Sequence, residues 1–334
     1  MTTIFSGIKP TGHLTLGNYL GAITRWVETD QYESDAFFSV VDLHALTVEH
    51  DPVRVRELSR RTATLMLAAG LDPEVCTLFV QSHVAEHARL SYLLECVATD
   101  GELRRMIQYR EKSARARESG QSVRFSLLSY PALMAADILA YRTDEVPVGE
   151  DQRQHVELAR DLAVRFNQRY GQTFTVPRAT APRVAARVMD LQDPTGKMGK
   201  SHAEGAGIVY LLDDLDTVRR KVARAVTDSG RDVVHDRAGR PGVSNLLDIL
   251  AACGGEGADP AELAGSYDSY GALKRDTAEA VIEVLRPLQE RYAELAADPG
   301  GVDAVLRAGA ERARSVAGPV VDAAYAAIGL LPAA

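Results

Sequence analysis

The chain opens with a strand, a turn and a helix, and this order restricts it to folds that place a turn beside a helix start. Residues 3–8 are mostly apolar and β-prone, residues 10–12 read Pro-Thr-Gly, and apolar side chains recur at helical spacing from Gly17 to Val27. A helix that begins with glycine lets a ligand approach its free backbone N–H groups, and its positive dipole end favours phosphate. The stretch contains neither a G-x-x-x-x-G-K-[ST] loop nor a G-x-G-x-x-G turn. It therefore indicates a nucleotide site of another kind, and a simple connecting turn is the alternative.

Strands and helices then alternate along the first half of the chain. Apolar runs over residues 36–41 and 77–80 are typical of parallel strands that are covered on both faces. Between them, Asp51 and Pro52 supply a helix cap and a first helical residue, and Gly70 is placed to end that helix. This order predicts an α/β fold with a doubly wound, Rossmann-like parallel sheet.

Asp42 and His44 follow the second expected strand. Open α/β sheets bind ligands at the carboxyl ends of their strands, so both side chains are expected near a site. A histidine packed in the core is the alternative for His44.

Composition is that of an ordinary globular protein with room for two domains. The chain has 334 residues, of which 46% are hydrophobic and 25% charged. It has no apolar run of about 18 residues and no basic start followed by an apolar stretch, so we expect a cytoplasmic protein without membrane contact. Cys76, Cys96 and Cys253 are isolated in apolar surroundings, which indicates buried packing residues rather than disulfides or a zinc site.

Positive charge is concentrated in two places, although the net charge is −8. One cluster lies between Arg104 and Arg117, and the other between Arg219 and Arg224. A transient RNA partner needs only such patches. Each cluster is equally compatible with a solvated helix face.

A single acid interrupts a strongly apolar helical stretch over residues 125–141. Tyr130, Met134 and Asp137 follow one another at helical spacings of four and three, so they fall nearly on the same face. A carboxylate among apolar neighbours must be hydrogen-bonded. It therefore either bridges neighbouring structure or accepts a hydrogen bond from a ligand.

Two further stretches combine polar side chains with turns. Gly149-Glu150-Asp151-Gln152 follows an expected strand and opens a helix to about Tyr170, so its acids either cap that helix or face a ligand. Residues 193–201 read Asp-Pro-Thr-Gly-Lys-Met-Gly-Lys-Ser and surround Lys197 and Lys200 with turn formers. This segment is either a generic surface loop or one whose cations stabilise a phosphate leaving group.

These stretches together resemble class I aminoacyl-tRNA synthetases. Thr15-Leu16-Gly17-Asn18 is similar to the HIGH signature of that class, and Lys197-Met198-Gly199-Lys200-Ser201 to its KMSKS loop. Residues 7–12, 17–19, 135–139 and 149–152 extend the resemblance to bacterial tryptophanyl-tRNA synthetases, from Thr3 to about Gly329. The resemblance implies that L-tryptophan attacks the α-phosphorus of ATP, carried with Mg²⁺, and that the tryptophanyl group then passes to tRNA(Trp).

The resemblance also implies roles for individual residues. Asp137 accepts the indole N–H, which is a donor only, while Arg110 and Lys112 match places of lysines that reach the ATP phosphates. The expected tryptophan-binding residues are Phe5, Gly7, His44, Tyr130, Met134, Asp137 and Gln152. The expected ATP-binding residues are Lys9, Thr11, Gly17, Asn18, Lys112, Gly149, Asp151, Gln152, Lys197, Met198, Lys200 and Ser201. Thr15, Asn18, Lys197 and Lys200 are expected to act in catalysis, without a resident metal.

The second half of the chain reads as almost entirely helical from Leu211 onward. This pattern predicts a bundle, which resembles an anticodon-binding domain. We expect a catalytic domain over residues 1–195, an anticodon-binding domain over 196–290, and C-terminal helices over 291–334 that pack back toward the catalytic domain. The resemblance further implies a homodimer.

Two alternatives and two departures qualify this reading. A tyrosyl-tRNA synthetase would share the fold but would need a polar pair for its phenol, and a non-catalytic paralogue would have lost ATP residues such as Asn18. Lys9 stands where the resembled family usually has glutamine, and Gly199 where it has serine. We hypothesise that Lys9 changes the binding of tryptophan-like inhibitors more than that of tryptophan, which would make an antibiotic-resistant form. Gly199 is expected to loosen its loop.

Overall fold

A parallel sheet forms the centre of the first half of the molecule. The structure is a computed structural model that describes residues 2–180, 187–199, 205–255 and 257–331, and within them five strands run in the order β3-β2-β1-β4-β5. The strands are β1 (Thr2–Ile8), β2 (Ser34–Val40), β3 (Thr77–Val80), β4 (Glu145–Pro147) and β5 (Arg178–Thr180). The chain moves outward from β1 to β3 and then returns to the other side of β1, so the loops after β1 and β4 diverge. Doubly wound sheets bind ligands at such a point, and the predicted fold class is confirmed.

The two faces of the sheet bury separate apolar cores. β1 and β2 pair in register from Thr2 with Ser34 to Ile8 with Val40, so alternate side chains enter opposite cores. Ile4 and Ile8 belong to the core that continues toward the C-terminal helices, whereas Phe5 belongs to the other.

Helices cover both faces. Residues 16–33 form one helix that contains α1 (Leu16–Asn18), two π-helical segments and α2 (Gln31–Glu33). The next helices are α3 (Pro52–Ala68), α4 (Glu86–Val97), α5 (Asp100–Arg105), α6 (Ile107–Glu118), α7 (Phe125–Leu139) and α8 (Glu150–Tyr170). α3 begins as predicted, because Asp51 Oδ1 accepts a hydrogen bond from the Val53 N–H at 2.9 Å. Gly70 follows its end with a φ of +112°.

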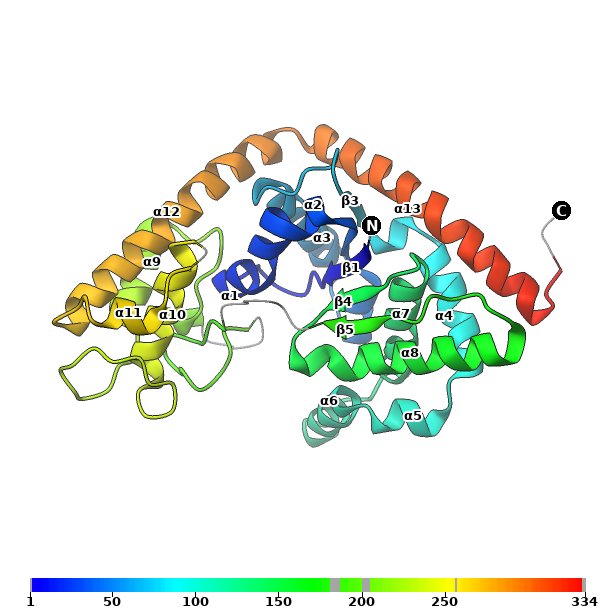
Figure 1. Ribbon diagram of the computed structural model, residues 1–334, viewed down its shortest axis with the longest axis horizontal. Coiled ribbons are helices and arrows are strands. Elements are labelled where there is room, and N and C mark those ends of the chain that lie inside the picture. The colour runs from blue at the N-terminus through cyan, green and yellow to red at the C-terminus, as the bar shows by residue number, and fades with distance from the viewer. Residues whose placement is uncertain (1, 181–186, 200–204, 256, 332–334) are drawn as a thin grey trace.

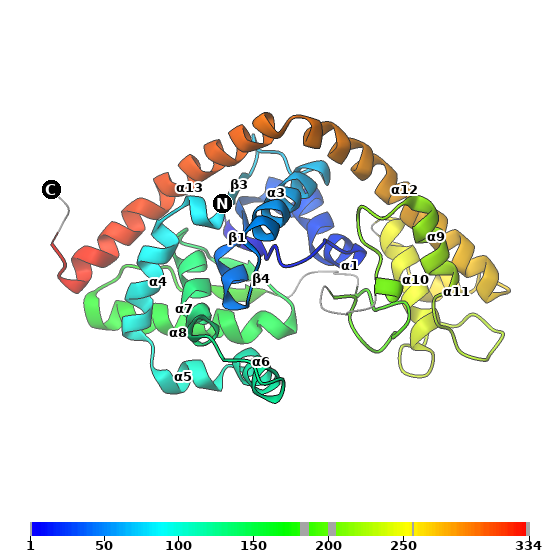
Figure 2. The ribbon, with the colours of Figure 1, turned by 180° about the vertical axis from the view of Figure 1, so that it is seen from behind.

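The second half of the chain is helical in its described part. α9 (Leu215–Ala223), α10 (Pro241–Cys253), α11 (Pro260–Ala264) and α12 (Tyr270–Ala297) pack together, and α13 (Pro299–Ile328) follows. Figures 1 and 2 show α12 and α13 as a long arch that runs from this bundle over the sheet domain toward α4. None of the described helices combines the length and apolar character that crossing a membrane requires.

The C-terminal helix α13 approaches the backbone of edge strand β3 closely. A Cβ atom at Gly309 would lie 1.8 Å from the carbonyl oxygen of Leu78, so this crossing requires glycine. Beyond the crossing, the small side chains of Ala310, Ala313 and Ala317 are buried in the core that also contains Phe5. α13 is thus packed on the sheet domain, as the contacts with β3 and α4 show.

The cysteines differ in exposure. Cys76 is buried and Cys253 is half-buried, but Cys96 is exposed, so the expected burial is wrong at that position. The reason is helical phase, since Leu93, Leu94 and Val97 of α4 turn inward and leave Cys96 on the outer face.

Candidate active site

Thr15 and Asn18 close the start of α1 in a capping box. Thr15 Oγ1 accepts from the Asn18 N–H at 3.2 Å, and Asn18 Oδ1 accepts from the Thr15 N–H at 3.1 Å. Thr15 is fully buried whereas Asn18 is half-buried. The Thr15 hydroxyl therefore orients the helix start, and Asn18 is the partner that remains within reach of a ligand.

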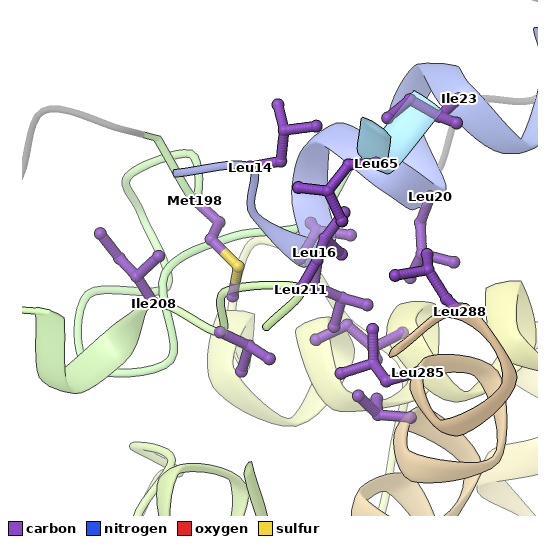
Figure 3. Packing of buried hydrophobic residues seen from close by; sticks show 14 of the residues in the cluster. Leu14, Leu16, Leu20, Ile23, Leu65, Met198, Ile208, Leu211, Leu285 and Leu288 are labelled. Atoms are coloured by element: carbon purple, nitrogen blue, oxygen red, sulfur yellow. The ribbon is translucent and has the colours of Figure 1, made fainter. Parts of the chain in front are cut away.

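The two signature stretches meet at Gly17 and Met198. A Cβ atom at Gly17 would lie 3.1 Å from the Met198 carbonyl oxygen, so a larger residue would press against the loop. Met198 is 1% exposed and lies in the same apolar cluster as Leu16 and Ile208 (Figure 3). Leu285 of α12 belongs to that cluster too. One core therefore joins the first helix, the loop that contains Lys197 and Met198 (the lysine loop), and the bundle of α9 to α12.

Backbone pairing fixes the base of the lysine loop. Met189 and Lys197 form an antiparallel bridge, and the Met198 N–H donates to the Val188 carbonyl at 3.0 Å. The Lys197 side chain is exposed beside this anchor. Lys200 and Ser201, which the sequence also assigns to ATP binding, lie outside the described residues.

A second helix start lies at the carboxyl end of β4. Gly149 is the exposed N-cap of α8, and the half-buried Gln152 donates its N–H to the Gly149 carbonyl at 3.0 Å. Thr11 is exposed in the loop that follows neighbouring strand β1. The starts of α1 and α8 thus follow the two loops, after β1 and β4, that diverge at the carboxyl edge of the sheet. The Asp151 side chain lies outside what the structure describes.

Asp137 is the centre of a buried polar network. His44 Nε2 lies 2.7 Å from Asp137 Oδ2, while Gln81 Nε2 and His87 Nδ1 each lie 2.6 Å from Oδ1. Burial raises the pKa of Asp137, but the nearby His44 and His87 outweigh it and lower that pKa to about 2. The carboxylate is therefore ionised and acts only as an acceptor.

Aromatic side chains border the network. Tyr130 precedes Asp137 by two turns of α7. Its hydroxyl lies 2.7 Å from His155 Nε2. Its ring packs edge to face against the His44 ring, with the two ring centroids 6.2 Å apart. Burial raises the pKa of Tyr130, so the phenol keeps its proton. Met134 is half-buried between them on the helix, and Phe5 is buried nearby in the same core. The structure thus places five of the residues expected to bind an aromatic amino acid in or beside one core: Phe5, His44, Tyr130, Met134 and Asp137.

Two lysines border this aromatic group. Lys9 Nζ donates to Thr47 Oγ1 at 3.2 Å, and burial together with the charge of Lys112 lowers the pKa of Lys9 to about 8. Lys112 Nζ lies 5.8 Å from the centroid of the Tyr130 ring. Gly7 is exposed at the end of β1, two residues before Lys9. Arg110 is exposed on α6, two residues before Lys112.

Two cations of the second basic cluster pair with acids. Arg219 pairs with Asp216 and Glu279, each at 2.7 Å. Lys221 Nζ lies 2.7 Å from Asp213 Oδ2. Arg220 and Arg224 of the same cluster are exposed on the surface.

Sequence reasoning missed three polar residues of the network. Gln81, His87 and Tyr141 do not stand out in the sequence, yet all three are buried. A signal existed for His87, which shares the apolar face of α4 with Leu90 and Leu94 at spacings of three and seven. A histidine in such a stripe requires a hydrogen-bond partner.

Comparisons with known proteins agree on one family. Residues 1–286 match the family model described as tRNA synthetases class I (W and Y). The chain is 75% identical over 333 residues to tryptophan–tRNA ligase 1 of Streptomyces avermitilis, with 100% of both chains covered. The structure of tryptophanyl-tRNA synthetase from Mycoplasma pneumoniae gives a TM-score of 0.91 at 35% identity, covering 99% of this chain and 98% of that one. The Campylobacter jejuni enzyme, solved with ADP and tryptophan, gives 0.83 at 32% identity, with 98% and 100% covered.

Proposed function

The chain belongs to the class I tRNA synthetases for tryptophan and tyrosine, and from this membership we propose how its site works. The protein is a tryptophan–tRNA ligase, an ATP-dependent aminoacyl-tRNA synthetase, as is the relative that shares 75% of its sequence. It activates L-tryptophan with ATP and transfers the tryptophanyl group to tRNA(Trp). Our account of selectivity rests on the carboxylate of Asp137, which is ionised and already hydrogen-bonded to His44, Gln81 and His87.

We assign indole recognition to Oδ2 of Asp137. A carboxylate has about four acceptor positions, and the described residues fill two on Oδ1 and one on Oδ2. The remaining position on Oδ2 suits a group that only donates, such as the indole N–H. Because His44 contacts the same oxygen and also meets the Tyr130 ring, this position is next to the aromatic residues. A site built around a buried hydrogen bond can reject analogues by roughly 10⁴ to 10⁵.

We assign ATP binding to the two helix starts and the lysines around them. Gly17, Asn18, Gly149 and Gln152 lie at the starts of α1 and α8, where backbone N–H groups and helix dipoles favour phosphate or polar ligand groups. The remaining proposed contacts are Lys9, Thr11, Lys112, Asp151, Lys197, Met198, Lys200 and Ser201. Thr15 supports this site through its cap on Asn18.

The activation step needs positioned charge more than a nucleophilic side chain. The tryptophan carboxylate oxygen bonds to the α-phosphorus, the bond from that phosphorus to the bridging oxygen breaks, and pyrophosphate leaves with the electron pair. Lys197 and Lys200 are proposed to stabilise the charge that develops on the leaving group. The exposed Lys197 ammonium lies next to the buried Met198 anchor, so the cation is held near the site while its tip moves. The tRNA ribose hydroxyl then displaces AMP.

Mg²⁺ is proposed to arrive as part of the ATP substrate. The described residues contain no group of three histidine, cysteine or acidic side chains that could hold a metal ion. Phosphate oxygens and water supply the ligands that Mg²⁺ prefers. The protein's own cations then act on the same phosphates.

We propose that the bundle binds the anticodon end of the tRNA. The catalytic domain covers residues 1–195, and the anticodon-binding domain begins at residue 196. Position 290, the expected end of that domain, falls inside α12. We therefore propose Asp298, between α12 and α13, as the boundary with the C-terminal segment. Cytoplasmic tRNA charging is the proposed setting.

A homodimer is part of the proposal. Tyr92 on α4 is 65% exposed, Phe125 at the start of α7 is 73% exposed, and Ile107 at the start of α6 is 56% exposed. α4 and α7 pack against each other, so these apolar side chains lie on neighbouring helices. We propose that together they form part of an apolar patch for the subunit contact, since contiguous exposed apolar surface marks interaction sites.

We propose that Lys9 makes this protein tolerant of tryptophan-like inhibitors. Its ammonium contacts Thr47, whose hydroxyl also donates to the His44 carbonyl at 2.9 Å. Lys9 is therefore connected to the loop that holds the Asp137 partner. An inhibitor that resembles tryptophan but carries different polar groups would meet this cation differently from the amino acid itself.

The test of the proposed function is aminoacylation. Purified protein, ATP, Mg²⁺ and labelled tryptophan should charge transcribed tRNA(Trp) but not tRNA(Tyr). Charging of tRNA(Tyr) with tyrosine instead would contradict the proposal.

A further inference from the structure

The Asp137 network continues through His87 to Tyr141. His87 Nδ1 contacts Asp137 Oδ1 at 2.6 Å, and the other ring nitrogen, Nε2, lies 2.7 Å from the Tyr141 hydroxyl. Tyr141 is 1% exposed and its ring stacks on Phe37 with centroids 4.5 Å apart. The histidine is fully buried. A chain of two side chains is therefore linked to Oδ1, the carboxylate oxygen that His44 does not contact.

Gln81 holds the same oxygen from another direction. Its Oε1 accepts from the Leu43 N–H at 3.0 Å, and its Nε2 donates to Asp137 Oδ1 at 2.6 Å. A backbone N–H can only donate and a carboxylate can only accept, so the amide has one possible orientation. Gln81 thereby connects the backbone beside His44 to Asp137.

Hydrogen-bond roles fix the protonation of His87. Burial raises the pKa of Tyr141, so its hydroxyl keeps a proton and must donate it. Among the described residues, His87 Nε2 is the acceptor placed to receive that proton. Because Nε2 accepts, the ring N–H that His87 donates to Asp137 is the one on Nδ1. The Tyr141 hydroxyl also opposes a ring flip, which would exchange these nitrogens for carbons.

We propose that His87 and Tyr141 are positioning residues for tryptophan selection, which saturate Oδ1 of Asp137 and leave the open acceptor position on Oδ2 for the indole N–H. This inference rests on the proposed role of Asp137. Neither residue needs to touch the substrate. They determine which lone pair of Asp137 stays open and where it points. Replacing them should therefore change how well the enzyme distinguishes substrates that carry the N–H from those that lack it.

The test compares tryptophan with its benzothiophene analogue, in which sulfur replaces the indole N–H. The measured quantity is the ratio of kcat/KM values for the two amino acids in ATP–pyrophosphate exchange. Tyr141→Phe keeps the stacked ring and removes only the hydroxyl. We expect this variant to lower the ratio about fivefold, the size of one lost neutral hydrogen bond, while the KM for ATP stays unchanged.

A pair of histidine substitutions separates positioning from packing. His87→Asn places an amide near the former Nδ1 and retains a donor to Asp137, whereas His87→Gln places its amide near the former Nε2 and loses that donor. We expect His87→Gln to lower the ratio by about tenfold or more, since a hydrogen bond to a charged group is lost. His87→Asn should preserve more of the ratio than His87→Gln does. Thermal unfolding of each variant identifies those that fold.

The outcomes distinguish this inference from the proposed function. If the wild-type protein uses tryptophan and the analogue equally well, the assignment of the indole N–H to Asp137 is wrong. If the wild type discriminates and folded Tyr141→Phe and His87→Gln variants retain the full ratio, only the positioning role is overturned. Equal losses of activity with both amino acids in all three variants would indicate packing alone and would likewise overturn it.

Discussion

His44 Nε2 lies 2.7 Å from Asp137 Oδ2, although 93 residues separate the two in the chain. His44 belongs to the turn after β2, and Asp137 lies on α7, which covers one face of the sheet. The contact therefore joins the carboxyl edge of the sheet to a core helix. It also places the buried carboxylate beside the aromatic side chain of Tyr130, whose ring meets that of His44.

Lys9 should make substrate binding depend on pH. Burial lowers the pKa of its ammonium from 10.5 to about 8, so the group is mostly charged at pH 7 and mostly neutral at pH 9. The KM for ATP should therefore rise across this range in the wild type, because a cation beside the phosphates is lost. Lys9→Gln should flatten this rise. A variant profile that is identical to the wild-type profile would remove Lys9 from the ATP site.

The lowered pKa of Lys9 also makes the stability of the folded protein depend on pH. The folded state disfavours the charged form, so Lys9 destabilises the protein below pH 8, and this cost is relieved as the pH rises from about 8 toward 10.5. The pH dependence has the same direction for Asp137, because its pKa is also lowered on folding. Its lowered pKa contributes stability above about pH 4, which is lost as the pH falls toward 2.

Lys9→Gln should also increase sensitivity to tryptophan-like inhibitors. Removing the cation restores a neutral amide next to Thr47 and the His44 loop. Inhibition constants for such compounds should fall, while the KM for tryptophan changes less. Unchanged inhibition constants would refute the proposed inhibitor tolerance.

Met198→Ala should weaken both stability and ATP binding. The side chain is 1% exposed in the core shared by α1, the lysine loop and the bundle, and removing a buried methionine side chain costs about 2–5 kcal/mol. Urea unfolding and the KM for ATP measure the two effects. Met189→Ala is the matched control, because Met189 lies in the same loop and is only half-buried. Equal destabilisation by both substitutions would argue against Met198 as the anchor.

Gly309→Ala should weaken the packing of α13 against β3 and so lower the stability of the protein. Its Cβ would overlap the Leu78 carbonyl at 1.8 Å, and overpacking of this kind costs about 1–3 kcal/mol or more. Gly318→Ala lies on the same helix with nothing within 4 Å of the added atom, so its better helix propensity should stabilise by up to about 1 kcal/mol. Thermal unfolding of the pair should give shifts of opposite sign. A neutral Gly309→Ala would show that the close crossing is not required.

Local signals made much of the fold predictable. Asp51, Pro52 and Gly70 mark the two ends of α3 within the sequence itself, and the apolar run that becomes β2 has the pattern of a covered parallel strand. Asp137 was identifiable because one acid interrupts an apolar helix face. In each case the relevant neighbours lie within a few residues.

Contacts between distant segments were not predictable in the same way. Gln81 and His87 reach Asp137 from 56 and 50 residues away, and no periodicity specifies that meeting. Thr15 reads as a ligand-facing residue in the signature, yet the fold buries it as a cap. Such outcomes depend on how the sheet places its loops and helices together.

The most direct test of the account is ATP–pyrophosphate exchange with tryptophan and with tyrosine, in the wild type and in Asp137→Asn. The wild type should exchange with tryptophan only. Asp137→Asn should lose about 10²-fold or more in kcat/KM for tryptophan, because an ionised acceptor becomes an amide that faces donors. The control Asp42→Asn alters another acid after β2, one that bonds Ser82, and should affect tryptophan far less. Tyrosine-dependent exchange by the wild type, or full tryptophan activity in a folded Asp137→Asn variant, would contradict the account.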